Sequence, residues 1–505
     1  MICGNQGIFL ITFEDIKSME LFNKTKKNIE HIKQRMQEDS DIKFRSFSAN
    51  GLNVCVIFMD GMVDKAQINE FIIKSVEECP EELKLNIENM AFNLVHCAEC
   101  VIKENFNDLI TSILGGNAVI IVDGDKRFIE AGVRKANMRA VAEPPTSQVI
   151  KGPREGFIEN VKNNVALIRN RLKTEKLKVN YITCGKYTET VIALCYIDGI
   201  ADKKVLDGIK KRIGEINIDA ILDSSYIAKF LELRPFSIFK QVGTTEKPDI
   251  ATAKLLEGRV AVIVDGSPIV LTLPYLLIED FQSPEDYYER KYRVTFTRLI
   301  RMVAIVFAII LPAAYVAAQI FNLSIIPLRF SLTILSSIKG IPLSPAIEML
   351  AVVLIFEILS EASIRMPKYV SMSLSIVGSL VLGQTAVTAG IISTPTLLIM
   401  AVSALSLYSA PELVGTLSIL RIVFIFLAGA LGIFGIMLGV IFLASYVVSL
   451  ESYGAPFFAP YAPIVVADLK DGIFKKEIME MQKRPKSFSQ HNDTRLKMPK
   501  TQDSK

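Results

Sequence analysis

Charged side chains are rare between residues 344 and 365, and those that occur follow a regular spacing. Glu357, Glu361 and Arg365 are four residues apart, so on a helix they would fall within about 80° of one another. Glu361 can pair with Arg365 one turn away, whereas Glu357 lies deeper and has no partner in its own segment. Because a carboxylate in hydrocarbon costs at least about 2 kcal/mol, Glu357 should face water or the interior of a helix bundle.

Two interpretations of these polar residues stay open. They could line an ion pathway or a proton relay, to which Glu348 on the opposite side of the helix and Gln384 on the next apolar segment would contribute. They could instead only hold helices together, and this second interpretation is favoured for Glu361 because Arg365 already neutralises it. The candidate pathway residues are Glu348, Glu357, Glu361, Arg365 and Gln384.

Long stretches without charge surround the acidic segment. Residues 302–328, 369–411 and 422–450 contain no Lys, Arg, Asp, Glu or His, and a helix that is apolar on every side requires lipid or a large protein interior. We predict full membrane crossings at 302–321, 344–364, 369–392 and 422–450, with shorter or re-entrant segments at 324–337 and 396–408. Basic residues gather at three places: before the first span, in the loop with Arg365 and Lys368, and in the tail. Four crossings put all three places on the same side of the membrane, which is the cytoplasmic one.

A different pattern, with dispersed charges, occupies the first part of the chain. Residues 54–65 and 192–203 both read as an apolar strand, an Asp-Gly turn and an Asp-Lys helix start, and 117–124 resembles 259–266. The repeat predicts a duplicated α/β soluble domain followed by an all-α multi-span membrane domain. The Asp-Gly pairs are typical of tight turns, which we favour over metal or phosphate sites. The predicted parts are two soluble modules at 1–142 and 143–293, a membrane domain at 294–467 and a basic cytoplasmic tail at 468–505.

The second module opens with a distinctive segment. Gly152, Pro153, Arg154 and Glu155 are candidates for contacts between subunits or modules, and Pro153 suits the first turn of a helix. That helix would bury the stripe Phe157, Val161, Val165, Ile168 and Leu172. The basic residues Arg169, Arg171 and Lys173 are expected to form its solvated face.

Several classes of protein are disfavoured by what the sequence lacks. It has no phosphate loop, dinucleotide fingerprint, zinc-protease motif or nucleophile elbow, so we expect no enzyme, no cofactor and no metal. The pair Cys97 and Cys100 is weak support for a metal site without a second pair. Since 57 Lys and Arg nearly balance 53 Asp and Glu, no nucleic acid is expected, and the tail is more consistent with a neighbouring anionic lipid surface. The N-terminus does not read as a signal peptide.

Long blocks of this sequence resemble the A subunits of spore germination receptors, the GerA family, over residues from about 40 to 475. The blocks include VIKGPREGFIENVKNNVALIRNRL at 149–172, FQSPEDYYER at 281–290, FEILSEASIRMP at 356–367 and SIVGSLVLGQTAVTAGIIS at 375–393.

The resemblance implies a multi-pass protein of the spore inner membrane that works with a transporter-like B subunit and a lipoprotein C subunit. It also implies that the complex senses small nutrients, and that A subunits oligomerise and line a ligand-gated cation pathway. A membrane-anchored scaffold and a secondary transporter are the alternatives. If the pathway interpretation holds, Glu357→Gln should weaken ion release at normal receptor levels.

Overall fold

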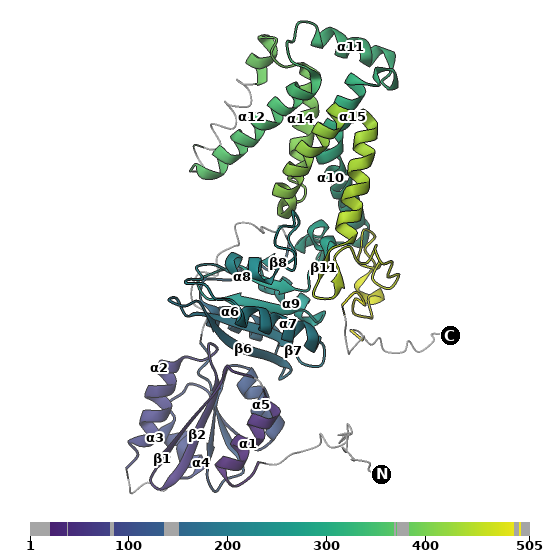
Figure 1. Ribbon diagram of the computed structural model, residues 1–505. Helices are drawn as coiled ribbons and strands as arrows, with labels where there is room; N and C mark the ends of the chain where they lie inside the picture. Colours follow the sequence, from purple (N-terminus) through teal and green to yellow (C-terminus); the bar gives the residue numbers. More distant parts are fainter. Residues whose placement is uncertain are drawn as a thin grey trace, which may run out of the picture.

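The computed structural model describes residues 21–37, 39–80, 85–135, 151–367, 370, 383–488 and 494–495. Two predictions lie outside these residues. They are the absence of a signal peptide at the N-terminus and most of the span at 369–392. Figure 1 shows two α/β modules and a bundle of long helices following one another along the molecule, with the first module farthest from the bundle.

Each module contains one antiparallel five-stranded sheet, and the strand order of the two sheets corresponds position by position. The order is β1-β2-β4-β5-β3 in the first sheet and β6-β7-β9-β10-β8 in the second. The first module consists of α1 (Thr25–Arg35), β1 (Ile42–Ala49), β2 (Leu52–Met59), α2 (Lys65–Ile68), η1 (Asn69–Lys74), α3 (Ser75–Glu77), α4 (Ile87–Asn89), η2 (Met90–Leu94), β3 (Cys100–Lys103), α5 (Phe106–Leu114), β4 (Ala118–Val122) and β5 (Phe128–Ala131). The second consists of α6 (Val161–Arg171), β6 (Leu177–Cys184), β7 (Thr190–Ile197), α7 (Lys203–Gly214), α8 (Ser224–Leu231), β8 (Gly243–Thr245), α9 (Pro248–Leu256), β9 (Val260–Val264) and β10 (Val270–Leu273).

Both sheets are buried on both faces, which explains their continuous apolar strands. In β2, Val54 and Val56 pack on the face covered by η1 and η2, while Cys55 and Ile57 pack on the face covered by α1 and α5. The second sheet follows the same rule, with α7 and α8 on one face and α6 and α9 on the other. Successive residues of a strand point to opposite faces, so a strand covered twice has no polar side.

The Asp-Gly pairs form turns, as the sequence predicts, and two of the aspartates also fix a helix start. Asp123 accepts a hydrogen bond of 2.6 Å from the backbone N–H of Thr25 at the start of α1. Asp265 accepts the equivalent bond of 3.0 Å from Val161 at the start of α6. The following glycines have positive φ, +93° at Gly124. Each turn therefore joins the central strand of its module to the first helix of that module.

The helix predicted to open near Pro153 begins later. α6 starts at Val161, where Asn160 caps it by accepting a bond of 3.1 Å from the N–H of Asn163. Residues 151–160 are not helical, and Pro153 does not occupy a first turn. The predicted apolar stripe, including Phe157 and Ile168, is buried.

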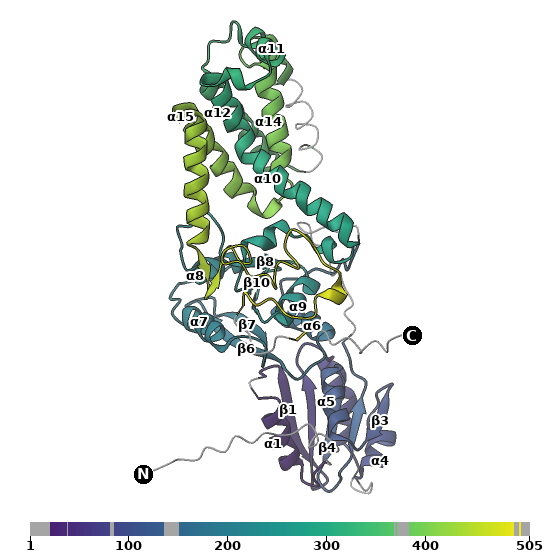
Figure 2. The same cartoon turned by 90° about the vertical axis from the view of Figure 1, so that its right-hand side faces the viewer.

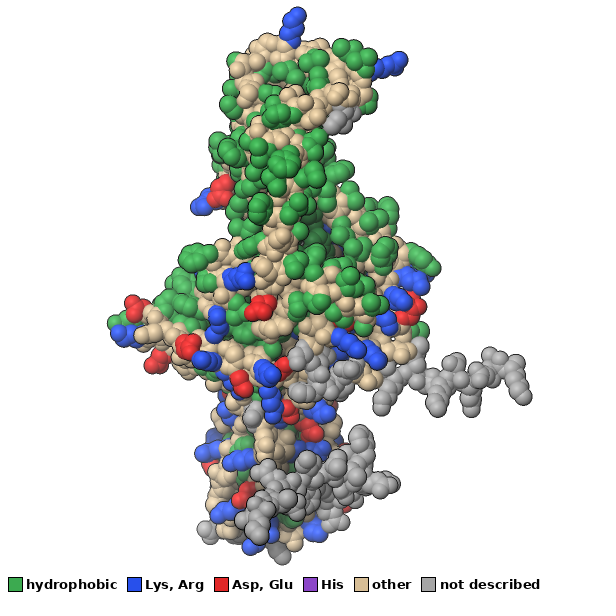
Figure 3. Space-filling view, turned by 45° about the vertical axis from the view of Figure 1, so that its right-hand side comes forward, with side chains coloured by type: hydrophobic (Ala, Val, Ile, Leu, Met, Phe, Trp, Pro, Cys, Tyr) green, Lys and Arg blue, Asp and Glu red, His purple; other side chains and the backbone are tan. Residues whose placement is uncertain are grey.

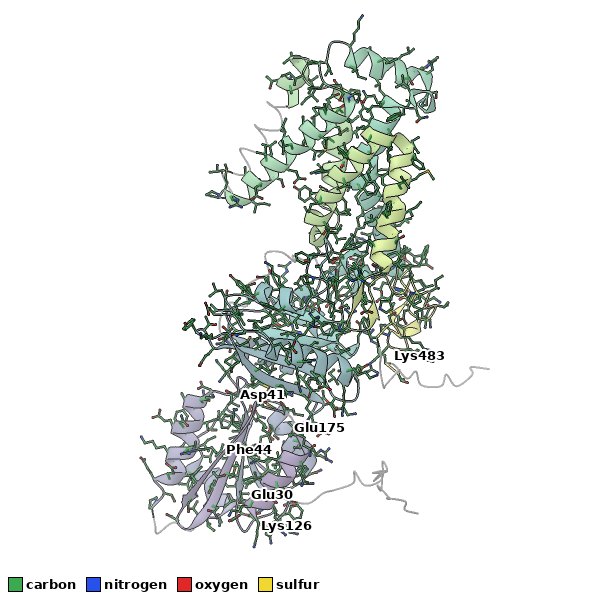
Figure 4. All side chains as sticks on the ribbon, viewed as in Figure 1. Glu30, Asp41, Phe44, Lys126, Glu175 and Lys483 are labelled. Carbon is green, nitrogen blue, oxygen red and sulfur yellow. The ribbon has the colours of Figure 1, made fainter. Side chains whose placement is uncertain are left out.

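Arg169 was expected on a solvated face, and that prediction is wrong. Its side chain is 1% exposed, and it bonds Asp41 Oδ2 at 3.0 Å and Asp39 Oδ1 at 2.5 Å, both in the first module. Lys162 on the same face of α6 reaches Asp60 at 2.9 Å, and Arg35 reaches Glu175 at 2.8 Å at the periphery. Figure 4 labels Asp41 of the first module and Glu175 of the second, both close to this boundary. The two modules are therefore joined through a buried ionic contact that α6 presents to the first module.

Two carboxylates face one guanidinium at this joint. Burial, with the hydrogen bond and charge of Asp41, raises the pKa of Asp39 to about 8. An unfolded aspartate titrates near pH 4, so between about pH 4 and pH 8 the folded state holds a proton that the unfolded state has lost. The contribution of Asp39 to stability therefore declines as the pH rises through this window.

Because one negative charge suffices for Arg169, we predict that Asp39→Asn and Asp41→Asn each cost about 1 kcal/mol. The double variant should cost about 3–5 kcal/mol, because it leaves a buried guanidinium without a counter-charge. Asp39→Asn should also remove the decline in stability between about pH 4 and pH 8. Thermal unfolding of the purified chain measures both effects. It is detected by the labelling of the thiols of Cys55 and Cys195, which are buried in the folded state. Additive single costs would contradict this account of the joint.

The helical bundle follows the second module through two short 3-10 turns. Its elements are η3 (Leu277–Phe281), η4 (Pro284–Tyr287), α10 (Lys291–Ile320), η5 (Leu323–Ile325), α11 (Leu328–Ile338), α12 (Pro345–Arg365), α14 (Thr394–Leu407), η6 (Pro411–Leu413), α15 (Val414–Val448), β11 (Glu451–Ser452), β12 (Ala455–Pro456) and η7 (Ile478–Glu480). Among the described residues, two helical stretches, Lys291–Ile320 and Pro411–Val448, are long and apolar enough by length and composition to cross a membrane. α12 has 21 residues and carries the acidic side chains, whereas α11 and α14 are short, as predicted for these segments.

The predicted single span at 422–450 is wrong in shape, because α15 reverses direction. Gly432 has φ +63° and ψ −142°, which breaks the helix. A Cβ at Gly435 would lie 2.2 Å from the carbonyl oxygen of Leu427, and one at Gly439 would lie 3.1 Å from the Phe424 ring. Residues so separated in sequence meet only if the chain turns back sharply between the arms 414–431 and 433–448, and Figure 2 shows the two arms diverging from this turn. Each arm is about 24–27 Å long.

The close approach of the arms makes a matched pair of glycine substitutions informative. Gly435→Ala would force the new methyl group into the Leu427 backbone and should cost about 1–3 kcal/mol. Gly415→Ala, in the same helix with no neighbour within 4 Å, should be neutral or stabilise by less than about 1 kcal/mol. Thermal unfolding in detergent compares them, and equal effects would mean that the arms do not touch.

Candidate functional site

The three largest fully buried side chains of the described residues are arginines, and each lies where two parts of the chain meet. Arg169 joins the two modules, Arg298 lies at the base of α10, and Arg421 lies inside the bundle. A buried guanidinium is stable only when charged and hydrogen-bonded partners surround it. These three positions therefore show how the two modules are joined, how the bundle is attached and how its helices are held together.

Arg298 ties the start of α10 to both the second module and the segment that follows the bundle. Its Nε donates to Asp286 Oδ2 at 2.8 Å, and its Nη1 donates to Asp471 Oδ1 at 3.1 Å. Tyr287 donates to the other oxygen of Asp471 at 2.8 Å. Since Asp286 precedes α10 and Asp471 follows α15, one side chain fixes the two ends of the bundle to each other.

The described residues after α15, which include part of the predicted basic tail, pack against the rest of the chain. Phe457 and Phe488 are buried, and Arg484 donates to the backbone oxygen of Leu256 in the second module at 2.7 Å. The aromatic ring of Phe488 lies 4.3 Å from the guanidinium of Arg259. Residues 451–488 thus fold back onto the second module, because their apolar and charged side chains find partners there.

Glu357, which has no partner in its own helix, pairs across the bundle. Its Oε1 lies 2.6 Å from Nη2 of Arg421 in the first arm of α15, and Arg421 also donates to Ser403 of α14 at 3.3 Å. The Arg421 side chain is 1% exposed, whereas that of Glu357 is 36% exposed. The pair therefore links three helices and leaves one edge of the carboxylate open.

Glu348 is enclosed completely and acts on a helix end. Its side chain has no exposed area, and Oε1 accepts bonds of 2.6 Å from the N–H and 2.8 Å from the hydroxyl of Ser393. Ser393 is the N-cap of α14, where the backbone dipole favours a negative charge. For Glu348 the structure thus favours a role in holding α12 against α14.

The remaining predicted pathway residues lie apart from these contacts. Glu361 and Arg365 form the expected pair at 2.6 Å, with side chains 61% and 78% exposed. Gln384 is exposed on a short helical stretch. The structure thus brings Glu357 and Glu348 into the bundle and leaves the other three on its surface.

The segment predicted to make subunit or module contacts lies beside the connection to α10. Gly152 has φ +124°, and a Cβ there would lie 2.8 Å from the ring of Tyr288. The carbonyl of Pro153 accepts a bond of 2.8 Å from Lys247, and Glu155 pairs with Arg171 at 2.5 Å. Arg154 is exposed. Contacts of this segment with another subunit stay a prediction.

The cysteine pair has little of the character of a metal site. Cys97 and Cys100 are half-buried, and burial with the charge of Cys100 raises the pKa of Cys97 to about 11. A thiol with that pKa is protonated at neutral pH, whereas a metal binds the thiolate. Among the residues that the structure describes, no group of three or more His, Cys, Asp or Glu side chains is placed to hold a metal ion.

Sequence reasoning missed the arginines that complete these contacts. Arg421 carries a signal, since it is the single charge between Glu412 and Glu451. An isolated charge in an apolar stretch requires a partner from elsewhere. Nothing in the local sequence distinguishes Arg298 from Arg293 or Arg301, because all three suit the start of a span.

The fold combines two α/β modules with an apolar helical bundle, and ionic contacts attach the bundle to the second module. The chain belongs to the GerA family: the family described as Bacillus/Clostridium GerA spore germination protein matches residues 30–487. This confirms the resemblance seen in the sequence. Germinant-receptor A subunits of this family are implicated in spore germination and function with other subunits.

Several relatives match over nearly their whole length. Spore germination protein KA of Bacillus subtilis is 34% identical over 93% of this chain and 87% of its own. An uncharacterized membrane protein of the same species, YfkQ, is 35% identical over 95% of this chain and 94% of its own. Spore germination protein GerLA of Bacillus cereus is 31% identical over 95% and 98%. A solved structure also matches this chain, the N-terminal domain of the A subunit of the Bacillus megaterium spore germinant receptor GerK3. The match covers 52% of this chain and 98% of that domain, with 30% identity and a TM-score of 0.42.

The pairing of Glu357 with Arg421 predicts an asymmetric response to charge removal. Glu357→Gln leaves a buried guanidinium without its counter-charge and should cost about 3 kcal/mol. The double variant Glu357→Gln, Arg421→Gln should recover most of that loss. Glu361→Gln, which breaks an exposed pair on the same helix, should cost less than about 0.5 kcal/mol. Thermal unfolding and protein level in spores measure these effects, and a Glu357→Gln variant as stable as Glu361→Gln would refute the buried pair.

Proposed function

We propose that this chain is a subunit of a nutrient germinant receptor in the spore inner membrane, where it oligomerises and lines a ligand-gated cation pathway. Family membership supports the role in germination. The proposed partners are the transporter-like B subunit and the lipoprotein C subunit. The observation that carries the pathway proposal is the exposed charged face of α12.

That face combines charge with exposure in an apolar bundle. Glu357, Glu361 and Arg365 lie along one side of α12, and their exposed fractions increase toward the end of the helix, from 36% to 61% to 78%. Charged groups at the level of lipid are stable only against water or other protein. Assembly of several copies with this side of α12 facing inward would give these groups a water-filled lumen, and glutamates in a lumen attract cations.

The junction around Arg298 supports an even number of crossings. Asp471, after the last arm of α15, contacts Arg298 of α10, and Arg484 farther along the same segment bonds Leu256 of the second module. Both flanks of the bundle therefore belong on the same side of a membrane. Basic residues gather at these flanks and at Arg365, which favours the cytoplasmic side for both termini.

A scaffold without ion conduction is the second candidate, and a specific observation favours it. Glu348 and Glu357 both have partners inside the chain, Ser393 and Arg421. Holding helices together is therefore a sufficient role for each of them. A secondary transporter, the third class, would require repeated halves with interrupted spans.

Ion flux across liposomes separates these functions. The complex reconstituted with its partner subunits should pass monovalent cations when nutrient is added, whereas a scaffold passes none. Glu357→Gln alone confounds flux with stability, so the charge-neutral double variant with Arg421→Gln is the informative one. This double variant should be present in the same amount as the unmodified protein and should pass cations several-fold more slowly. Unchanged conduction in a normally assembled double variant would remove Glu357 from the pathway.

A further inference from the structure

The second module carries an exposed apolar surface that the proposed pathway does not use. Leu222, just before α8, and Tyr226 and Phe230 on α8 follow one another at four-residue intervals and are 66%, 39% and 42% exposed. In the loop that follows, Phe236 is 100% exposed and Ile238 is 40% exposed. We call these five residues the α8 patch.

The α8 patch is continuous with the apolar surface of the bundle. Phe239, the next residue after Ile238, is buried in the same cluster as the helices, with its ring 6.3 Å from that of Tyr446. The backbone oxygen of Ile238 accepts a bond of 2.7 Å from Thr416, and Arg234 donates to Ser449 at 3.1 Å. These contacts fix the loop at the level where both arms of α15 leave the bundle.

Figure 3 shows hydrophobic side chains covering the bundle and continuing onto the part of the second module nearest to it, with charged side chains concentrated farther away. A boundary of this kind marks the level of a membrane surface on a protein. Aromatic side chains are favoured at that level because their rings enter the headgroup region. Arg234 and Lys229, exposed beside the patch, suit the phosphate groups of anionic lipid.

We propose that the second module rests on the bilayer through the α8 patch, with Phe236 inserted among the lipid headgroups. This inference rests on the proposed membrane crossing of the bundle. The occupant is lipid rather than a second protein, because the patch adjoins the apolar cluster of the helices at Phe239 and is flanked by the basic side chains of Lys229 and Arg234. The second module would then be held to the membrane at two places, its connection to α10 and the loop that carries Phe236. It could therefore not rotate freely about α10.

A single-tryptophan experiment tests the contact, because the natural chain contains no Trp. Phe236→Trp in the full chain is reconstituted in phosphatidylcholine–phosphatidylglycerol vesicles with and without bromine on the upper acyl chains. Its emission should shift to shorter wavelength on reconstitution and be quenched by the brominated lipid. Phe92→Trp, at a phenylalanine 76% exposed in the first module, is the control that should stay at the wavelength of water and unquenched.

Phe434→Trp, at a phenylalanine 62% exposed on α15, reports separately on the membrane crossing. If Phe434→Trp is quenched and Phe236→Trp is not, the bundle crosses the bilayer and the lipid contact of the α8 patch is refuted. If neither is quenched, the proposed crossing itself fails. A short-wavelength emission of Phe236→Trp without quenching would assign the patch to a protein partner and would likewise overturn the inference.

Discussion

A guanidinium removed from water must meet a counter-charge, and this requirement determines how the parts of the molecule are joined. Arg169, Arg298 and Arg421 each draw a carboxylate from another part of the chain, and each is almost fully buried. Apolar packing is tolerant of small shifts, whereas a buried ion pair is strongly destabilised when one partner moves away. The three contacts therefore specify the relative position of the modules and the bundle more sharply than apolar packing would.

These contacts follow one another from the first module to the helices. α6 carries Arg169 toward the first module, and the second module continues into the connection that holds Asp286 against Arg298. From there α10 leads into the bundle, where Arg421 meets the acidic helix α12. These pairs lie beside further contacts between the second module and the bundle, among them the hydrogen bonds Thr416–Ile238 and Arg234–Ser449.

Where the sequence signal was periodic, the prediction held. The duplicated strand pattern became two sheets of corresponding order, because continuous apolar strands can be satisfied only by cover on both faces. The stripe from Phe157 to Leu172 is buried for the same reason. Arg169, in contrast, was placed on the solvated face because its partners lie about 130 residues away in sequence. The reversal at Gly432 was missed because an apolar stretch has the same composition whether it runs straight or folds back.

The sequence by itself determined the class of each part: alternating and continuous apolar patterns define strands, charge-free stretches define the bundle, and long blocks of residues define the family. Only the tertiary structure decided which charge meets which: Glu357 is paired with Arg421, and Glu348 bonds Ser393, the N-cap of α14. It also decided that Arg484, after the bundle, returns to the second module. The reason is physical. Burial depends on a residue's own chemistry and its neighbours in the chain, whereas ion pairing in a low-dielectric interior depends on distances that only the folded chain sets.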